Sequence, residues 1–259
     1  MHKMTLPEFL KWAFCEELAH VATVGGSAAW SMMASYAALG TVIDTFGTGG
    51  AGLPELANVH PDALAANEAV MLLAGEAFEL PEGWQPCPDL ADPHGLIATC
   101  YREVAERRAL SYSGDRNQNL IGLVIACAMI GKEPEWRVKQ PNFRLVTRSG
   151  KPAWFNVEAH KTQDGRVYDY ETDGYDRKAG RPKPGAYRKY EIDPDHPFGG
   201  AIQARIDWYL WSGAMERMAE RLSKGLKSHE IRPYSVLREP WLSEPFSRGG
   251  EQVLEIASE

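Results

Sequence analysis

Three acidic residues and one lysine in the middle of the chain have the types and spacing of a metal-dependent nuclease site. Asp169 and Glu171 are separated by one residue, so on a β-strand both side chains point to the same face. If the Asp-Gly pair at 164–165 closes a hairpin, Glu158 on the preceding strand lies near them, with Lys161 close by. Carboxylates that converge beside a lysine hold Mg²⁺ around a scissile phosphate. The pattern therefore predicts a nuclease as one alternative, although alternating charges on a solvent-exposed strand have the same spacing.

Other catalytic motifs are absent from the sequence or incomplete. It contains no H-E-x-x-H, no G-x-S-x-G, no Walker lysine and no E-x-K element of the kind that metal-dependent nucleases usually show. The glycines at 47–52 match G-x-G-x-x-G, but a helical pattern precedes them where a strand is required, which predicts a loop between helices. Glu17 and His20 form a single E-x-x-H, whereas a di-iron bundle needs two copies. The sequence predicts no cofactor and no metal site, and it favours a protein that is not an enzyme.

The stretch 177–189 is the strongest candidate for a binding surface. It contains six lysines and arginines and no acidic residue, although the whole chain has a net charge of −7. Such a segment attracts phosphate groups, and contacts from six cations make binding strongly dependent on salt. A solvated loop, or a surface that binds an acidic protein, has the same composition. The basic side chains are Arg177, Lys178, Arg181, Lys183, Arg188 and Lys189.

The centre of this stretch, Gly180-Arg181-Pro182, resembles the core of an AT-hook. In that motif an extended Gly-Arg-Pro segment lies in a narrow A·T minor groove, and the arginine is drawn to the negative potential of the groove. The resemblance implies binding to DNA through Arg181. Ala179 stands where the AT-hook has an arginine, so the resemblance covers a short core only.

Charge is distributed unevenly along the sequence. Residues 1–100 have a net charge of −10, residues 101–190 a net charge of +7 and residues 191–259 a net charge of −4. This asymmetry indicates a polyanionic partner, an acidic protein partner or an internal electrostatic match. The acidic first hundred residues can present a polyanionic surface to a nucleic-acid-binding protein, and they also serve solubility.

The first half of the chain has the periodicity of helices. Thr5 followed by Glu8 predicts a capping box at the start of one helix. Apolar residues at helical spacing predict further helices. Their expected ranges are 27–46, 60–78, 95–108 and 119–130.

From residue 143 to 192 the period becomes two, with turn residues between the runs, which predicts an antiparallel meander of three or four strands with a basic hairpin loop. A long C-terminal helix at about 198–228 follows. This order of elements is typical of the α+β class. We expect a helical region at 1–132 and a sheet with the C-terminal helix at 133–259, either as two regions or as one continuous domain.

Composition indicates an ordinary globular protein. The hydrophobic fraction is 44% and the charged fraction 24%. No apolar run is long enough to span a membrane, and the first residues lack the apolar region of a signal peptide. The four cysteines lie far apart without a C-x-x-C pair, which favours reduced thiols over disulfides or zinc. We therefore expect a cytoplasmic protein that does not contact a membrane.

Two segments, "PEFLKWAFCEELAH" and "GYDRKAGRPKPGAYRKYEIDPD", together with the Trp-rich helix that follows, are similar to uncharacterised proteins carried by phages and prophages. The resemblance implies an accessory protein that acts in the cytoplasm of a bacterial host, where DNA-handling factors and inhibitors of host defence are both common. We expect a non-enzymatic protein that binds nucleic acid through the stretch 177–189. The alternative is an inhibitor that binds a host defence complex or another nucleic-acid-binding protein complex, and the third hypothesis is the metal-dependent nuclease.

Overall fold

The protein combines helices and short strands, which confirms the α+β class. None of the described helices is long and apolar enough to cross a membrane. The helix expected at 27–46, the loop expected at 47–52 and His20 lie outside the described residues. The computed structural model describes residues 1–19, 59–111, 118–162, 164 and 166–243.

The chain divides into two compact units, and each is built from separate stretches of sequence. Most of the longest helix, α7 (Gly199–Leu222), belongs to the first unit, although it follows the strands in the sequence. Its presence confirms the long C-terminal helix. The first unit comprises Met1–Asp89, Glu106–Arg137 and Gln203–Glu259, and the second comprises Leu90–Ala105 and Val138–Ile202.

Helix α1 (Leu6–Trp12) begins at the predicted capping box. The Thr5 hydroxyl accepts a hydrogen bond from the Glu8 backbone N–H at 3.4 Å, and the Glu8 carboxylate accepts one from the Thr5 backbone N–H at 2.8 Å. These two bonds satisfy backbone donors that have no partner inside the helix. The helix continues into a π-helical turn, Ala13–Glu17, and its buried side chains join the core of the first unit.

The other helices of the first half lie near their predicted ranges. Helix α4 (Pro61–Met71) is shorter than predicted, because a 3₁₀ turn at Leu72–Gly75 follows it. Helix α6 (Gln118–Ile130) matches its predicted range and ends at Gly131. With a φ of +69°, Gly131 allows its backbone N–H to bond back to the Cys127 carbonyl at 2.9 Å. Helix α5 (Leu96–Ser111) also lies close to its predicted range.

Arg205 on α7 is a buried arginine with only 2% of its surface exposed. Its guanidinium donates hydrogen bonds to both carboxylate oxygens of Asp89, to the Pro86 carbonyl at 2.9 Å and to the Trp136 carbonyl at 3.2 Å. The guanidinium carbon also lies 4.8 Å from the centre of the Trp241 ring, in cation–π contact. Three segments that are distant in sequence are therefore fixed to one helix.

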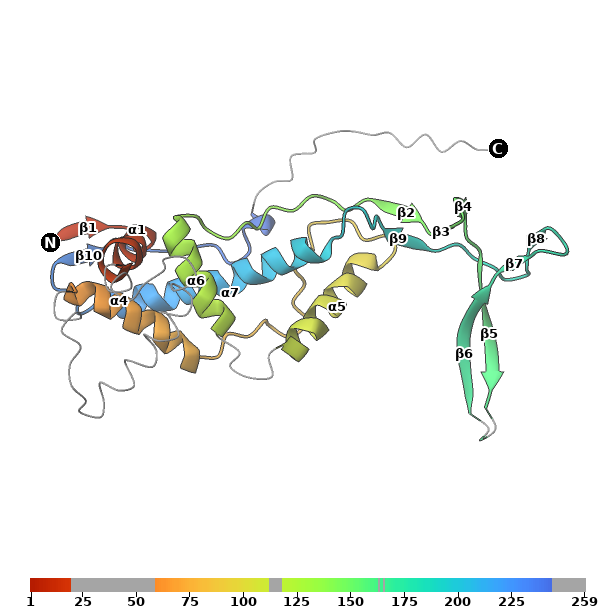
Figure 1. Ribbon diagram of the computed structural model, residues 1–259, viewed down its shortest axis with the longest axis horizontal. Coiled ribbons are helices and arrows are strands. Elements are labelled where there is room, and N and C mark those ends of the chain that lie inside the picture. Colours follow the sequence, from red (N-terminus) through yellow and green to blue (C-terminus); the bar gives the residue numbers. More distant parts are fainter. Residues whose placement is uncertain (20–58, 112–117, 163, 165, 244–259) are drawn as a thin grey trace. The chain divides into compact units, whose positions relative to one another are not determined.

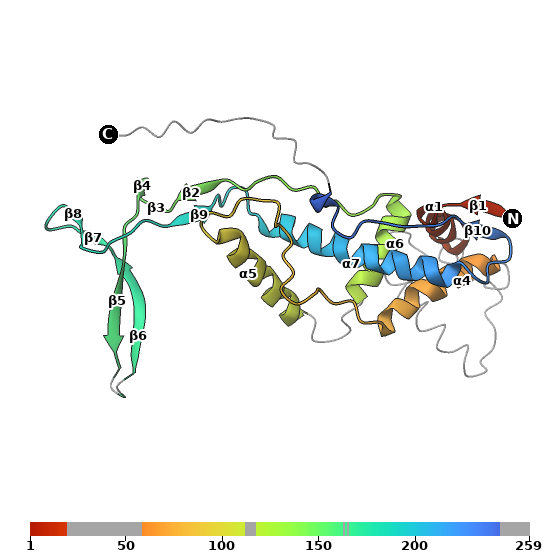
Figure 2. The same cartoon turned by 180° about the vertical axis from the view of Figure 1, so that it is seen from behind.

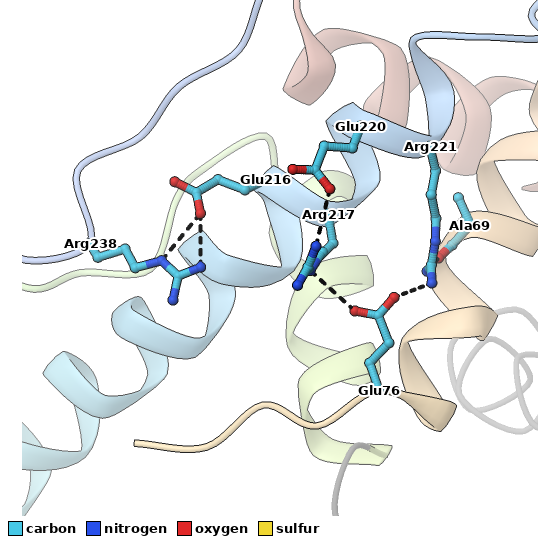
Figure 3. A network of polar contacts seen from close by, with 7 residues as sticks. All are labelled: Ala69, Glu76, Glu216, Arg217, Glu220, Arg221 and Arg238. Atoms are coloured by element: carbon cyan, nitrogen blue, oxygen red, sulfur yellow. Dashed lines mark hydrogen bonds and ion pairs between the residues drawn. The ribbon is translucent and has the colours of Figure 1, made fainter. Parts of the chain in front are cut away.

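Ion pairs connect the C-terminal half of α7 to its surroundings (Figure 3). The carboxylate of Glu76, just after α4, contacts Arg221 and lies 3.6 Å from Arg217. On the other side, Glu216 accepts a hydrogen bond at 2.9 Å from Arg238 in the segment that follows β10 (His229–Ile231). The helix is thus tied both to the end of α4 and to the C-terminal segment.

The first described strand of the chain pairs with the last described strand in the first unit. Strand β1 (His2–Met4) pairs in parallel with β10, and the two lie side by side in both views (Figure 1 and Figure 2). Asp62 in the first turn of α4 accepts hydrogen bonds from three successive backbone N–H groups that lead into β10. This buried carboxylate therefore holds the start of β10 against α4.

The strands of the second unit pair two by two, so the predicted meander of three or four strands does not appear among the described residues. Prolines at 182 and 184 lack the N–H that continued pairing needs, and among the described residues the backbone of the returning chain bridges to β5 only between Phe155 and Tyr187. The longest pair is the β5–β6 hairpin (Figure 1). The antiparallel pairs are β2 (Phe143–Leu145) with β9 (Tyr190–Ile192), β3 (Thr147–Arg148) with β4 (Lys151–Pro152), β5 (Phe155–Lys161) with β6 (Val167–Asp173), and β7 (Tyr175–Asp176) with β8 (Arg181–Pro182).

The burial of Arg205 predicts a large effect of its removal. We expect Arg205→Ala to lower the free energy of unfolding by about 3–5 kcal/mol, because Asp89 would keep a largely buried charge without its partner. Urea denaturation followed by circular dichroism measures this change. Arg217→Ala is the matched control, since the Arg217 side chain is 57% exposed, and we expect a loss of about 1 kcal/mol or less. Equal losses in the two variants would contradict the prediction.

Candidate functional site

The register of the β5–β6 hairpin sorts its side chains onto two faces. Directly paired residues of antiparallel strands place their side chains on the same side of the sheet. Glu158 pairs with Tyr170, whereas Val157 pairs with Glu171 and Ala159 with Asp169. We call the first side the tyrosine face, formed by Asn156, Glu158, His160, Tyr168, Tyr170 and Thr172, and the second side the acidic face, formed by Phe155, Val157, Ala159, Lys161, Val167, Asp169, Glu171 and Asp173.

The hairpin does not bring together the three carboxylates considered for a nuclease. Asp169 and Glu171 share the acidic face, as their spacing predicts, and Lys161 lies on this face as well. Glu158 lies on the tyrosine face. The sequence places Glu158 near the pair but leaves open which face it occupies, and the register decides this. The shared ligand set on which the nuclease hypothesis depended is therefore divided between two sides of the hairpin.

Two lysines of the basic stretch bind the hairpin's own carboxylates. On the tyrosine face, the Lys183 ammonium donates to Glu158 at 3.2 Å, and the Thr172 hydroxyl donates to the same oxygen at 3.0 Å. On the acidic face, Lys189 contacts the Glu171 carboxylate, which also accepts a hydrogen bond from the Tyr187 hydroxyl at 2.8 Å. The basic stretch therefore contacts the hairpin on both faces, and both of these lysines are held by its carboxylates.

These contacts stabilise the charged form of both carboxylates. Hydrogen bonds from Thr172 and then from Lys183 hold the pKa of Glu158 below its ordinary value. The hydrogen bond from Lys189, supported by Tyr187, lowers the pKa of Glu171. Both side chains stay ionised at neutral pH and neutralise part of the positive charge of the stretch.

The remaining cations of the stretch are displayed at its surface. Arg188 lies over Trp154, with its guanidinium carbon 4.6 Å from the ring centre, and Arg177 is 3.8 Å from the Asp173 carboxylate. Lys178 and Arg181 are exposed, and neither makes an ion pair with any described residue. These two side chains are the cations of the stretch that are freest to contact a phosphate.

A tight turn between β7 and β8 presents Lys178 and Arg181. The Asp176 carboxylate accepts hydrogen bonds from the backbone N–H groups of Lys178 at 2.9 Å and Ala179 at 3.0 Å. Gly180 has a φ of +66°, which a residue with a side chain rarely adopts. The Gly-Arg-Pro core is therefore folded at its glycine, in contrast to the extended conformation that the AT-hook resemblance implies.

The tyrosine face carries an exposed cluster of rings that the sequence shows only as alternating aromatic residues. Tyr168 is 49% and Tyr170 42% exposed. The His160 ring lies 5.3 Å from Tyr168 and 6.0 Å from Tyr170, measured between ring centres. Aromatic rings held in this way on a strand face are suited to stacking on planar groups such as nucleobases.

The first unit contains a polar cluster that the sequence analysis missed. His60, Asp62 and His229 place three atoms capable of binding a metal within 4.8 Å of one another. His229 is far from the other two in sequence, so no spacing motif reveals the cluster. Only the contact between α4 and β10 brings these side chains together.

The described part of the second unit thus displays two exposed groups of side chains that are candidates for binding. One is the exposed pair of cations at the β7–β8 turn, and the other is the ring cluster on the β5–β6 hairpin. Searches against protein-family models, curated proteins and solved structures find no match to this chain.

The contact between Lys183 and Glu158 predicts a measurable change in pKa. In Lys183→Met the pKa of Glu158 rises toward its ordinary value, because the charged form loses a hydrogen bond and a nearby positive charge. Carbon-detected NMR titration of the side-chain carboxyls measures this shift, and Glu171 is the internal control because its partner is Lys189. An unchanged Glu158 pKa in the variant would contradict the contact.

The same contacts predict the direction of acid sensitivity. The pKa of each carboxyl is lower in the folded protein than in the unfolded chain, so each contributes stability above the unfolded pKa. That contribution is lost as the pH falls through the folded pKa. We expect the protection factors of the β5–β6 amides, taken relative to intrinsic exchange at each pH, to fall in this acidic range, and to fall less in Lys183→Met.

Proposed function

We propose that this protein binds single-stranded nucleic acid through its second unit. In this proposal Lys178 and Arg181 contact phosphates, and the tyrosine face of the β5–β6 hairpin stacks on unpaired bases. The observation that carries the proposal is the exposed cluster of His160, Tyr168 and Tyr170 in the unit that also displays unpaired cations. Proteins that bind single strands without sequence preference combine these two features.

Stacking of bases on the exposed tyrosines favours single-stranded over double-stranded nucleic acid as the target. Every base has an aromatic face, and base–aromatic stacking contributes about 1–3 kcal/mol for each base. In a duplex these faces are covered by neighbouring bases, so exposed tyrosines have little to stack on. The folded turn at Gly180 also argues against a Gly-Arg-Pro segment lying extended in a minor groove.

The internal ion pairs reduce the number of cations available to phosphates. Six contacts to a single strand give a slope of about −4 in a plot of log K against log salt concentration, and three contacts give about −2. Lys183 and Lys189 are held by Glu158 and Glu171, and Arg188 lies over Trp154. We therefore propose the smaller slope, from Lys178, Arg181 and Arg177, whose ion pair with Asp173 is long and exposed.

The second candidate is an inhibitor that binds a nucleic-acid-binding protein complex of a bacterial host. The net charge of −10 in residues 1–100 favours this alternative, because a polyanionic surface competes with nucleic acid for a basic site. Affinity purification from host cells with nuclease treatment distinguishes the two. Recovery of a protein complex that survives the nuclease, together with no direct binding to oligonucleotides, supports the inhibitor.

The tyrosine face predicts a specific loss of affinity. We expect Tyr168→Ala with Tyr170→Ala to weaken binding to a fluorescent oligothymidine of about twelve nucleotides by at least tenfold, because the stacking partners are removed. Fluorescence anisotropy measures the affinity. Val157→Ala is the matched control, since Val157 is exposed on the acidic face of the same strand pair. Unchanged affinity of the double variant would contradict the proposed stacking.

The exposed turn predicts the salt dependence. Each of Lys178→Ala and Arg181→Ala should make the slope of log K against log salt less negative by about 0.7. Anisotropy titrations between about 50 and 200 mM salt measure the slope. Lys151→Ala is the control, because Lys151 is an exposed cation on β4 that the proposal does not assign to a phosphate. Binding that does not respond to salt in the unmodified protein would contradict phosphate contacts.

A further inference from the structure

We propose that His60, Asp62 and His229 form a binding site for a divalent transition-metal ion of the zinc type. This site lies in the first unit and does not depend on nucleic-acid binding. The Nδ1 atom of His229 is 2.9 Å and the Nδ1 atom of His60 is 3.9 Å from the Oδ2 atom of Asp62. Bonds of about 2.0–2.2 Å from one ion place its ligand atoms about 3–4 Å apart, close to these two distances, and all three ligand atoms lie within 4.8 Å of one another.

The carboxylate of Asp62 is ionised and fixed in place before any ion arrives. Its oxygens accept hydrogen bonds from the backbone N–H groups of Lys227 at 2.7 Å, Ser228 at 2.9 Å and His229 at 3.1 Å. Burial raises its pKa, but these bonds and the one from the His229 ring outweigh burial and bring the pKa down to about 2. Carboxylates that bind metals are typically oriented by such outer hydrogen bonds.

The imidazole of His60 is also oriented by its surroundings. The backbone N–H of His60 donates a hydrogen bond to the Glu17 carboxylate at 3.1 Å. The residue occupies the N-cap position of α4. The side chain of His60 is 29% exposed, whereas that of Asp62 is almost fully buried. An ion therefore reaches the site from the His60 side.

Aromatic rings surround the two histidines. The Trp12 ring centre lies 4.3 Å from that of His229 and 5.3 Å from that of His60, and Phe9 lies 5.6 Å from His229. A shell of this kind limits access of water and strengthens electrostatic interactions between an ion and its ligands. The site combines charged and neutral donors with an apolar wall.

Binding exchanges two hydrogen bonds for coordination bonds. The ion takes the place of the proton between His229 Nδ1 and Asp62 Oδ2; the neutral imidazole releases that proton to solvent and takes one up at Nε2, so the ring binds the ion as a neutral ligand. The ion also binds the lone pair of His60 Nδ1. Without an ion, this lone pair accepts a hydrogen bond from the Asp62 backbone N–H at 3.0 Å. A single hydrogen bond contributes little to stability beside a coordination bond to a divalent ion, so coordination outweighs the loss.

Two imidazoles and one carboxylate define the class of ion. Imidazole suits zinc, copper, iron and nickel, and a carboxylate is a common third ligand of zinc. Magnesium and calcium prefer oxygen ligands alone. Three protein ligands leave a fourth position for a water molecule, as in zinc sites with an open coordination position.

The test is a titration of the full-length protein, freed of metal by a chelator, with Co²⁺ and Zn²⁺. We expect one ion per chain, with a visible Co²⁺ absorption band typical of four-coordinate nitrogen and oxygen ligands. We expect His60→Ala and His229→Ala each to weaken binding by at least 100-fold. His196→Ala is the matched control, because His196 also lies beside a carboxylate, that of Asp193 at 3.2 Å, and should bind as the unmodified protein does.

A second measurement covers the case in which a His229 variant does not fold. Zn²⁺ should raise the Tm of the unmodified protein in proportion to the logarithm of its concentration above Kd, and this rise should be absent in His60→Ala. Absence of one-to-one binding by the unmodified protein overturns the proposal. Binding that the His60 and His229 substitutions leave unchanged overturns it as well, and in both cases the cluster is a hydrogen-bonded connection between α4 and β10 only.

Discussion

The buried charge of Arg205 is the constraint on which the first unit depends. A guanidinium has five N–H donors and no acceptor, and it keeps its charge at every accessible pH, so its burial requires a complete set of acceptors. Asp89, Pro86 and Trp136 supply these acceptors from two segments far from α7 in sequence. The hydrogen bonds of this one side chain therefore fix two distant segments of the chain to α7. The ion pairs of Glu76 and Glu216 attach further segments to the same helix.

In the second unit, charged side chains at the surface are also paired with charges of opposite sign. The hairpin carries carboxylates on both faces, and the basic stretch returns along it with Lys183 on one face and Lys189 on the other. Part of the positive charge thus holds the structure together, and only the remainder is available to a partner. A count of basic residues overestimates the binding surface for this reason, because it cannot separate internal ion pairs from displayed cations.

Asp62 illustrates how one carboxylate can organise both structure and chemistry. Three backbone N–H groups hold it ionised in a buried position, where it fastens β10 to α4. The same bonds place it beside two imidazoles within a wall of aromatic rings. A group that is pre-oriented for a structural purpose needs little reorganisation to become a metal ligand, which is why the two roles are compatible in one cluster.

The sequence by itself determined the elements whose signals are local. The Thr5–Glu8 capping box, the helix at 119–130 and the period of two in β5 and β6 depend on patterns within a few residues, and the structure confirms each of them. The tertiary structure alone decided which groups meet. The register put Glu158 on the face opposite Asp169 and Glu171, and folding brought His229 to His60 and Asp62. Contacts of this kind depend on strand register and on packing between distant segments. Neither produces a residue spacing in the sequence that would predict them.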